Sequence, residues 1–210
     1  MKPDSIILDI DGTLWNSTPI VADAWNKVIE KRADIPFRFT AHQLTQLFGR
    51  SLSAIADLAF PFLEEKDRYS LIDACCEQEH KYLYASEHNL LYPGVADTIQ
   101  KLSSKYKLFI VSNCQNGYIE LFLDKTGLGP YITDFECPGT SARSKGTNIR
   151  LVTERNALKN PVYVGDIQGD QIASREAGVP FCYASYGFGS VENPDYTIRQ
   201  FSDLLTLFQD

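Results

Sequence analysis

The sequence predicts an α/β fold in which a parallel sheet is interrupted by an all-helical segment. The first observation behind this prediction is that short apolar runs alternate with helical patterns from about residue 93 onward. The second is that residues 17–90 contain several helical patterns and no convincing strand. Because an apolar run at residues 5–10 precedes this helical segment, we assign that run to the same sheet as the later strands.

The expected strands are short, and three of them are continuously apolar, as in a sheet that helices cover on both faces. We place them at residues 5–10, 107–112, 131–137, 161–165 and 180–184. The helical patterns between them cover residues 95–105, 117–126, 147–157 and 168–177.

The helical segment contains one long predicted helix, from residue 64 to about residue 86. Apolar residues at steps of four and seven give this helix a single apolar face, formed by Leu71, Ile72, Cys75, Cys76, Tyr82 and Leu83. The stretch "LYPGV" at residues 91–95 leads back to the sheet, with its proline near the start of the next helix. We therefore predict a core domain of residues 1–16 and 91–210 and a helical cap domain of residues 17–90.

Composition narrows the class of protein. The chain has 210 residues, of which 44% are apolar and 22% charged, as in an ordinary globular domain. Its formal charge of -7 argues against a nucleic-acid partner, and no segment approaches transmembrane length or resembles a signal peptide. The five cysteines are odd in number and irregular in spacing, which favours reduced thiols and a cytoplasmic location. Nothing in the pattern indicates an oligomeric state.

Two aspartates, Asp9 and Asp11, follow the first apolar run in the stretch "SIILDIDGT". An Asp-Gly turn of a hairpin is one explanation, but the residues that follow resemble a turn that enters a helix. An EF-hand loop is excluded because its further acidic positions are absent. Two close carboxylates need a compensating charge, and Mg²⁺ is a cation that prefers oxygen ligands.

A second acidic strand end occurs at "VYVGDIQGD", where Asp166 and Asp170 follow the apolar run of residues 161–165. Taken alone, Asp166 would be a helix cap and Asp170 a partner of the helix dipole. The carboxyl ends of parallel strands share one edge of a sheet, however, and ligands bind there. We therefore expect both aspartates near Asp9 and Asp11.

A third strand end carries Ser112 and Asn113, which could cradle an anion together with the backbone N–H groups of the following helix. An ordinary turn or cap is the alternative for both residues. Lys145 precedes the helical pattern of residues 147–157 and lies in the chain between the second and third of these strand ends. That place in the order makes it a candidate for the same site, although a single lysine is more often simply solvated.

These motifs, taken in order, resemble those of the haloacid dehalogenase superfamily of phosphohydrolases. The matching elements are Asp9-Ile-Asp11-Gly-Thr13, Ser112-Asn113, Lys145 and Gly165-Asp166-Ile-Gln-Gly-Asp170. The resemblance implies a Rossmann-like parallel core with an inserted all-helical cap, close to the branch of phosphoglycolate phosphatase and β-phosphoglucomutase. One departure is that many relatives have Lys-Pro at the third motif, where this chain has "SKGTNI".

The resemblance also implies roles for the acidic residues. Asp9 would be the nucleophile that forms an aspartyl-phosphate, and Asp11 would be the general acid and base. Mg²⁺ would bind to the side chains of Asp9 and Asp166 and to the backbone carbonyl of Asp11, with Asp170 acting through water.

For the remaining motif residues, the resemblance implies contacts with the substrate. Ser112 and Lys145 would hold the phosphoryl oxygens, and Gly12, Thr13 and Asn113 would line the phosphate site. In the cap, Arg50 of "LFGRSLSAIA" could pair with a second anionic group of the substrate, with a solvated arginine as the alternative.

The sequence therefore indicates a Mg²⁺-dependent phosphomonoester hydrolase, similar to phosphoglycolate phosphatase, that acts on a small phosphorylated metabolite. Three alternatives stay open: a phosphosugar mutase, a nucleotidase or pyrophosphatase, and a regulatory binding protein without activity. The mutase would need an acid or base in the cap, and the sequence does not single one out.

Overall fold

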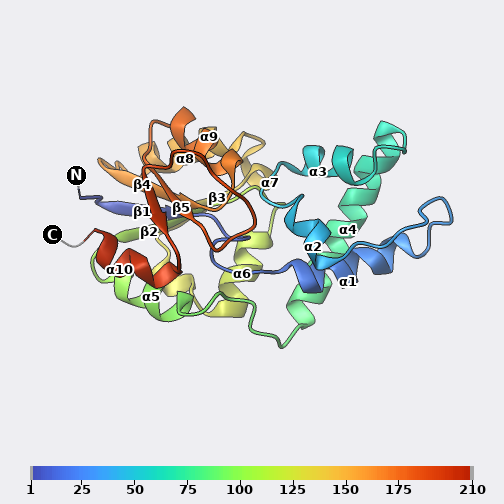
Figure 1. The fold of residues 1–210 in the computed structure, drawn as a ribbon, viewed down its shortest axis with the longest axis horizontal. Coiled ribbons are helices and arrows are strands. Elements are labelled where there is room, and N and C mark those ends of the chain that lie inside the picture. Colours follow the sequence, from blue (N-terminus) through green and yellow to red (C-terminus); the bar gives the residue numbers. More distant parts are fainter. Residues whose placement is uncertain (1, 209–210) are drawn as a thin grey trace.

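A computed structural model describes residues 2–208 and contains a six-stranded, fully parallel sheet with helices on both faces (Figure 1). The strand order is β3-β2-β1-β4-β5-β6, which places β1 next to both β2 and β4. The predicted α/β fold with a Rossmann-like sheet is confirmed. The strands are β1 (Ser5–Leu8), β2 (Lys107–Val111), β3 (Asp134–Glu136), β4 (Pro161–Gly165), β5 (Phe181–Ala184) and β6 (Tyr196–Ile198).

Helices follow β1 and then alternate with the remaining strands. Between β1 and β2 lie α1 (Thr18–Ile29), α2 (Ala41–Thr45), α3 (Leu52–Ala59), α4 (Glu65–Ala85) and α5 (Val95–Ser103). The rest are α6 (Tyr118–Thr126), α7 (Pro138–Ser141), α8 (Lys145–Arg155), α9 (Gln168–Glu176) and α10 (Leu204–Leu207), with 3₁₀ turns η1 (Gly129–Tyr131) and η2 (Phe201–Asp203).

The strands are apolar along their whole length because both faces of the sheet are covered. In β1, Ile6 and Leu8 pack into a core on one face, together with side chains of α5 and α6. Ile7 points to the other face and joins a core with side chains of α8 and α9. All three side chains are completely buried, as the period of two along a strand requires when both faces are dry.

Some predicted boundaries were wrong. The strand predicted at residues 131–137 is shorter, because Gly129–Tyr131 form the 3₁₀ turn η1 and pairing starts at Asp134. The helix predicted from residue 147 starts at Lys145, because the Ser144 hydroxyl accepts a hydrogen bond from the Thr147 backbone and caps it. Strand β6 was not predicted, since three residues at a sheet edge give no apolar run.

Helices α1–α4 gather to one side of the sheet (Figure 1). The two chain segments that join them to the sheet run side by side, because Asn16 N donates to Leu90 O at 2.9 Å and Tyr92 N donates to Leu14 O at 3.0 Å. Inside the group, the Trp25 ring of α1 packs edge-on against Phe39, at 5.7 Å between ring centroids. The group therefore has apolar packing of its own.

Two further predictions concern the surroundings of the protein. Within residues 2–208, no helix combines the length and the apolar character needed to cross a membrane. The five cysteines are all free and buried, as expected for reduced thiols.

We predict that Phe109→Ala lowers the free energy of unfolding by about 3–5 kcal/mol, because it removes a fully buried ring from the inner strand β2. Urea unfolding followed by circular dichroism measures the change. Leu58→Ala is the control, since Leu58 is 53% exposed and its loss should cost less than about 0.5 kcal/mol. Equal losses in both variants would mean that Phe109 is not part of a packed core.

Candidate active site

The sheet topology brings the predicted site residues to one edge. Asp9 and Asp11 follow β1, Ser112 follows β2 and Asp166 follows β4, and β1 is hydrogen-bonded to both of the other strands. The pairing of β1 with β4 continues to the first aspartate, because Asp9 N donates to Val164 O at 2.9 Å. The carboxyl ends of three adjacent parallel strands thus form the site, as open α/β sheets favour.

Three carboxylates meet there, from Asp9, Asp166 and Asp170. One oxygen of each lies within 4.8 Å of the others, and all three residues are completely buried. Lys145, which is 4% exposed, places its ammonium nitrogen 2.6 Å from Asp170 Oδ1 and 3.1 Å from Asp9 Oδ1. The structure therefore brings together Lys145 and three of the four predicted aspartates, and Asp11 is the exception.

The side chains of the protein do not neutralise the charge of this acidic cluster on their own. Burial, together with the neighbouring Asp170 carboxylate, raises the pKa of Asp9, although Lys145 and Ser112 oppose the rise. Burial and the carboxylates of Asp170 and Asp9 raise the pKa of Asp166 well above its usual value. Burial alone would lower the pKa of Lys145, but the Asp170 and Asp9 carboxylates raise it, so this lysine stays charged. Three buried acids against one cation leave negative charge to be neutralised.

The acidic cluster fits a hard dication such as Mg²⁺. Neither oxygen of Asp9 has a regular hydrogen bond within residues 2–208, although both are buried. Lys145 lies 3.1 Å from Asp9 Oδ1, but it also pairs with Asp170, and buried carboxylate oxygens with so few donors are costly unless a further cation binds them. The cluster offers only oxygen ligands, which Mg²⁺ prefers.

Asp166 and Asp170 are also held by the backbone. Asp170 Oδ2 accepts hydrogen bonds from the N–H groups of Asp166 and Ile167, at 3.0 and 3.1 Å, and so caps α9. Asp166 Oδ2 accepts one from Phe188 N at 2.7 Å. The simple explanation of Asp170, a first-turn partner of the helix dipole, accounts for the oxygen at the start of α9, while its other oxygen pairs with Lys145.

Two glycines make room for the Asp166 side chain. A Cβ atom on Gly12 would lie 2.1 Å from Asp166 Oδ2, and the φ angle of Gly12 is +81°. A Cβ atom on Gly187, in the "YGFGS" loop, would lie 2.3 Å from Asp166 Cβ. Both positions therefore need glycine. Next to Gly12, Thr13 is buried and directs its hydroxyl to Asp166 Oδ1 at 3.5 Å.

The Asp11 side chain points away from the acidic cluster. Its Oδ1 accepts hydrogen bonds from Ser17 Oγ at 2.6 Å, Tyr118 OH at 2.9 Å and Trp15 Nε1 at 3.0 Å. Burial raises the pKa of Asp11, and these three donors oppose the rise. The sequence offered no signal for Ser17 or Tyr118 as partners of Asp11.

The loop after β2 contacts the chain segment that carries the helices α1–α4. Ser112 is buried beside Asp9, and Asn113 Nδ2 donates to Gly49 O at 2.9 Å. Arg50 is exposed and lines a pocket of about 470 Å³ together with Asn113 and Gln168, which we call the outer pocket. Arg50 therefore lies at the rim of the site rather than beside the carboxylates.

One buried acid near the site was not predicted. Glu79 of α4 is 4% exposed, and its carboxylate accepts hydrogen bonds from Trp25 Nε1 at 2.9 Å and from Gln115 Nε2 at 3.2 Å. Burial raises its pKa to about 7, although these two donors oppose the rise. A signal was available, since Glu79 lies on the apolar face of the long helix, four residues from both Cys75 and Leu83.

Glu79 and Asp11 line the same small cavity, which we call the inner cavity. Its volume is about 20 Å³, which is room for about one water molecule. The amides of Asn113 and Gln115 also line it, together with apolar side chains of Phe48, Leu52 and Ile55. The inner cavity thus separates Asp11, next to the sheet, from Glu79 on the helical side.

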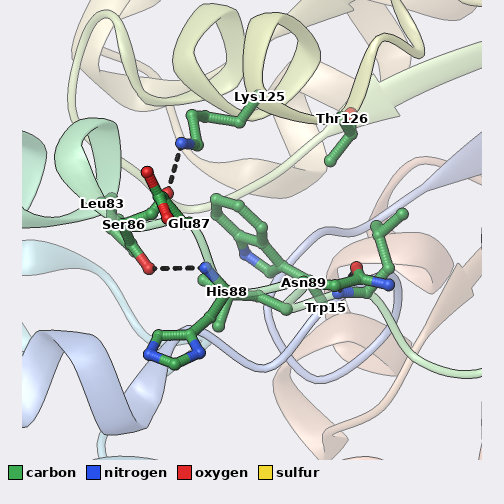
Figure 2. A pocket seen from close by; sticks show the side chains of 10 residues that line it. Trp15, Leu83, Ser86, Glu87, His88, Asn89, Lys125 and Thr126 are labelled. Atoms are coloured by element: carbon green, nitrogen blue, oxygen red, sulfur yellow. Dashed lines mark hydrogen bonds between the residues drawn. The ribbon is translucent and has the colours of Figure 1, made fainter.

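A larger pocket, of about 350 Å³, lies where α4 ends and the chain returns to the sheet (Figure 2). Lys125 donates hydrogen bonds to the carbonyls of Tyr84 and Ser86 there, at the last turn of α4. Since these carbonyls have no partner inside the helix, the lysine acts as a C-terminal cap. This pocket contains none of the predicted site residues, and we assign Lys125 to fastening α4 to α6.

A parallel α/β sheet with acidic residues and a lysine at the carboxyl edge is typical of phosphate-handling enzymes. Residues 6–184 match the haloacid dehalogenase-like hydrolase family. The chain belongs to this family, which confirms the predicted resemblance and the prediction of an enzyme.

The chain is similar to phosphoglycolate phosphatases. It is 24% identical to the enzyme from Vibrio parahaemolyticus, with 95% of this chain and 93% of the relative covered. It is 27% identical to the enzyme from Agrobacterium fabrum, over 94% and 89% of the two chains. Among solved structures, a haloacid dehalogenase-like hydrolase from Streptococcus pneumoniae has the same fold, with a TM-score of 0.85, 20% identity and 99% of both chains covered. The relatives support a phosphatase.

The burial of Glu79 predicts that the stability of the folded chain depends on pH. In the folded chain its pKa is about 7, against 4.5 for an unburied glutamate, so the folded state favours the neutral form. Relative to Glu79→Gln, the wild type should lose stability as pH rises from about 4.5 to about 7, by roughly 3 kcal/mol in total, and change little above that.

Urea unfolding at several pH values measures this difference. Glu77→Gln is the control, because Glu77 lies on the same helix and is exposed. If both substitutions gave the same pH profile, Glu79 would not be the buried acid described.

Proposed function

We propose that this hydrolase is a Mg²⁺-dependent phosphatase that cleaves a small phosphorylated metabolite through an aspartyl-phosphate on Asp9. The observation that supports this most directly is the environment of Asp9. Its buried oxygens have no regular hydrogen bond within residues 2–208, and Lys145 lies 3.1 Å away. A carboxylate whose main partner is a single lysine keeps a lone pair free to react, and the lysine supplies positive charge for a phosphoryl group.

The metal would be held by the side chains of Asp9 and Asp166 and the backbone carbonyl of Asp11, with Asp170 outside this set. Asp170 suits that position because the backbone and Lys145 already occupy its oxygens. When bound, Mg²⁺ would neutralise the carboxylates and draw charge from the phosphoryl oxygens.

In the first chemical step, an Asp9 oxygen attacks phosphorus and the bond from phosphorus to the leaving oxygen breaks. Lys145 and Ser112 stabilise the charge on the phosphoryl oxygens. Asp11 gives its proton to the leaving oxygen, which suits a carboxyl group whose pKa is raised by burial.

In the second step, water attacks the phosphorus atom of the aspartyl-phosphate, and Asp11 takes up the proton of that water. The bond between phosphorus and the Asp9 oxygen breaks, which restores the carboxylate and releases inorganic phosphate. Trp15, Ser17 and Tyr118 all hold Asp11 Oδ1. The other oxygen, Oδ2, accepts none of these bonds and is the one we assign to proton transfer.

Residues 17–90 are proposed to form a cap domain that closes over the site. The hydrogen bonds from Asn113 to Gly49 and from Gln115 to Glu79 join the β2 loop to this segment and support a closed arrangement. Closure excludes water, which strengthens the electrostatic interactions inside. Arg50, at the rim, is proposed to meet an anionic group of an incoming substrate. The cytoplasmic location stays a prediction, supported by the five free cysteines.

Phosphate release from a panel of esters tests the proposed function. The panel contains 2-phosphoglycolate, sugar phosphates, nucleoside monophosphates and pyrophosphate, each with Mg²⁺ and with EDTA. We expect release that requires Mg²⁺ and favours a small monoester. Release that is unaffected by EDTA would contradict the metal site, and an isomerised sugar phosphate without free phosphate would indicate the mutase.

Asp9→Asn should lower the rate of phosphate release by at least about a thousandfold, because an amide is a poor nucleophile. The fold should be kept, since Asn has the shape of Asp and loses only charge. Circular dichroism checks the fold, and Asp23→Asn on the exposed side of α1 is the control with unchanged activity. Substantial residual turnover in Asp9→Asn would remove Asp9 as the nucleophile.

A further inference from the structure

Stability of the fold does not explain why a glutamate occupies position 79. Its neighbours on the buried face of α4 are Leu71, Ile72, Cys75, Cys76 and Leu83. No Lys or Arg forms an ion pair with Glu79 in the described part of the chain. A buried carboxyl group without a cation destabilises a protein, and an apolar residue at this position would be more stable.

The Glu79 carboxylate is held in a fixed orientation. Trp25 Nε1 donates to Oε2 and Gln115 Nε2 donates to Oε1, so each oxygen has one donor and keeps a free lone pair. The two donors come from α1 and from the β2 loop, on either side of the inner cavity. A carboxylate with both oxygens anchored and lone pairs to spare is prepared to accept hydrogen bonds from a bound molecule.

We place the alcohol part of a substrate in the inner cavity. The proposed function places the leaving oxygen beside Asp11, and Asp11 and Glu79 line the same cavity. Atoms attached to the leaving oxygen therefore extend toward Glu79. The cavity holds only about 20 Å³ in this structure, so α1–α4 must move apart slightly to admit even a small group.

The chemistry of the lining selects a hydrogen-bond donor. Glu79 has an oxygen that accepts a hydrogen bond whether the group is ionised or neutral, and the lining described within residues 2–208 contains no Lys, Arg or His. A carboxylate on the substrate would find no cation there and would face two acids. A hydroxyl or an ammonium group would instead give a hydrogen bond to Glu79.

We propose that Glu79 determines substrate specificity, by accepting a hydrogen bond from a hydroxyl or ammonium group next to the leaving oxygen. The preferred substrates are then phosphate monoesters of small alcohols that carry such a donor, and 2-phosphoglycolate is a poor one. This rests on the proposed phosphatase activity. It makes Glu79, rather than Arg50 at the rim, the residue that discriminates among alcohol groups.

Four esters of nearly equal size test the proposal: 2-hydroxyethyl, 2-aminoethyl and ethyl phosphate, and 2-phosphoglycolate. For the wild type with Mg²⁺, we expect kcat/KM to be at least tenfold higher for a donor-bearing ester than for ethyl phosphate, and lowest for 2-phosphoglycolate. A site built to bind a donor rejects an analogue that lacks it. Whichever of 2-hydroxyethyl and 2-aminoethyl phosphate has the higher kcat/KM shows whether the site prefers a hydroxyl or an ammonium group.

Variants at position 79 separate recognition from folding. Glu79→Leu should bring the kcat/KM ratio of donor-bearing ester to ethyl phosphate close to one, and Glu79→Gln should retain part of the hydroxyl preference. The ratio is the measured quantity because a purely structural defect would lower all four rates together. Glu77→Leu and Glu77→Gln, at the exposed position on α4, should leave the ratio unchanged.

Two results would overturn the proposal while leaving the phosphatase in place: a wild type that prefers 2-phosphoglycolate, or a ratio that Glu79→Leu does not change. If no ester of this series or of the wider panel is hydrolysed in the presence of Mg²⁺, the proposed function fails, and the role of Glu79 falls with it.

Discussion

The charge of three buried carboxylates is the constraint on which the site depends. Asp9, Asp166 and Asp170 converge at the carboxyl edge of the sheet with Lys145 as their cation. Such a cluster stays ionised only if further positive charge is available, which is why a dication fits it. The sheet order matters for the same reason, because it places β1 between β2 and β4 and so brings the three strand ends together. The glycines at positions 12 and 187 then give the Asp166 side chain the space it needs.

The two aspartates that follow β1 lie in different environments. Asp9 faces the acidic cluster, whereas the Asp11 side chain turns to Trp15, Ser17 and Tyr118. In a regular strand, residues two positions apart point to the same face, so Asp9 and Asp11 differ because the strand ends at Leu8 and the chain then turns toward Gly12. The Asp9 carboxylate is therefore suited to bind a metal ion and attack phosphorus. The Asp11 carboxyl group, which lies between the sheet and the helical segment, is suited to hold a proton.

The sequence indicated which residues gather at the carboxyl edge of the sheet more accurately than it located the ends of the strands and helices, for physical reasons. Acidic residues directly after apolar strands mark the carboxyl edge, so Asp9, Asp11 and Asp166 could be placed from the sequence pattern. Strand β6 could not, because a short edge strand has no apolar run. Phe188, Ser17 and Tyr118 were missed because their contacts come from loops and helices far apart in the chain, which no local pattern encodes. Glu79 was visible as an interruption of an apolar helix face, yet only the structure relates it to Asp11.

The most direct measurement is a calorimetric titration of the metal-free protein with Mg²⁺, compared with the same titration of Asp166→Asn. If the acidic cluster is a metal site, the wild type binds one Mg²⁺ per chain, and the variant, which lacks one ligand charge, binds it at least tenfold more weakly. If the wild type binds no Mg²⁺, or if both proteins bind it equally, then a dication does not balance the three carboxylates, and their burial must have another cause.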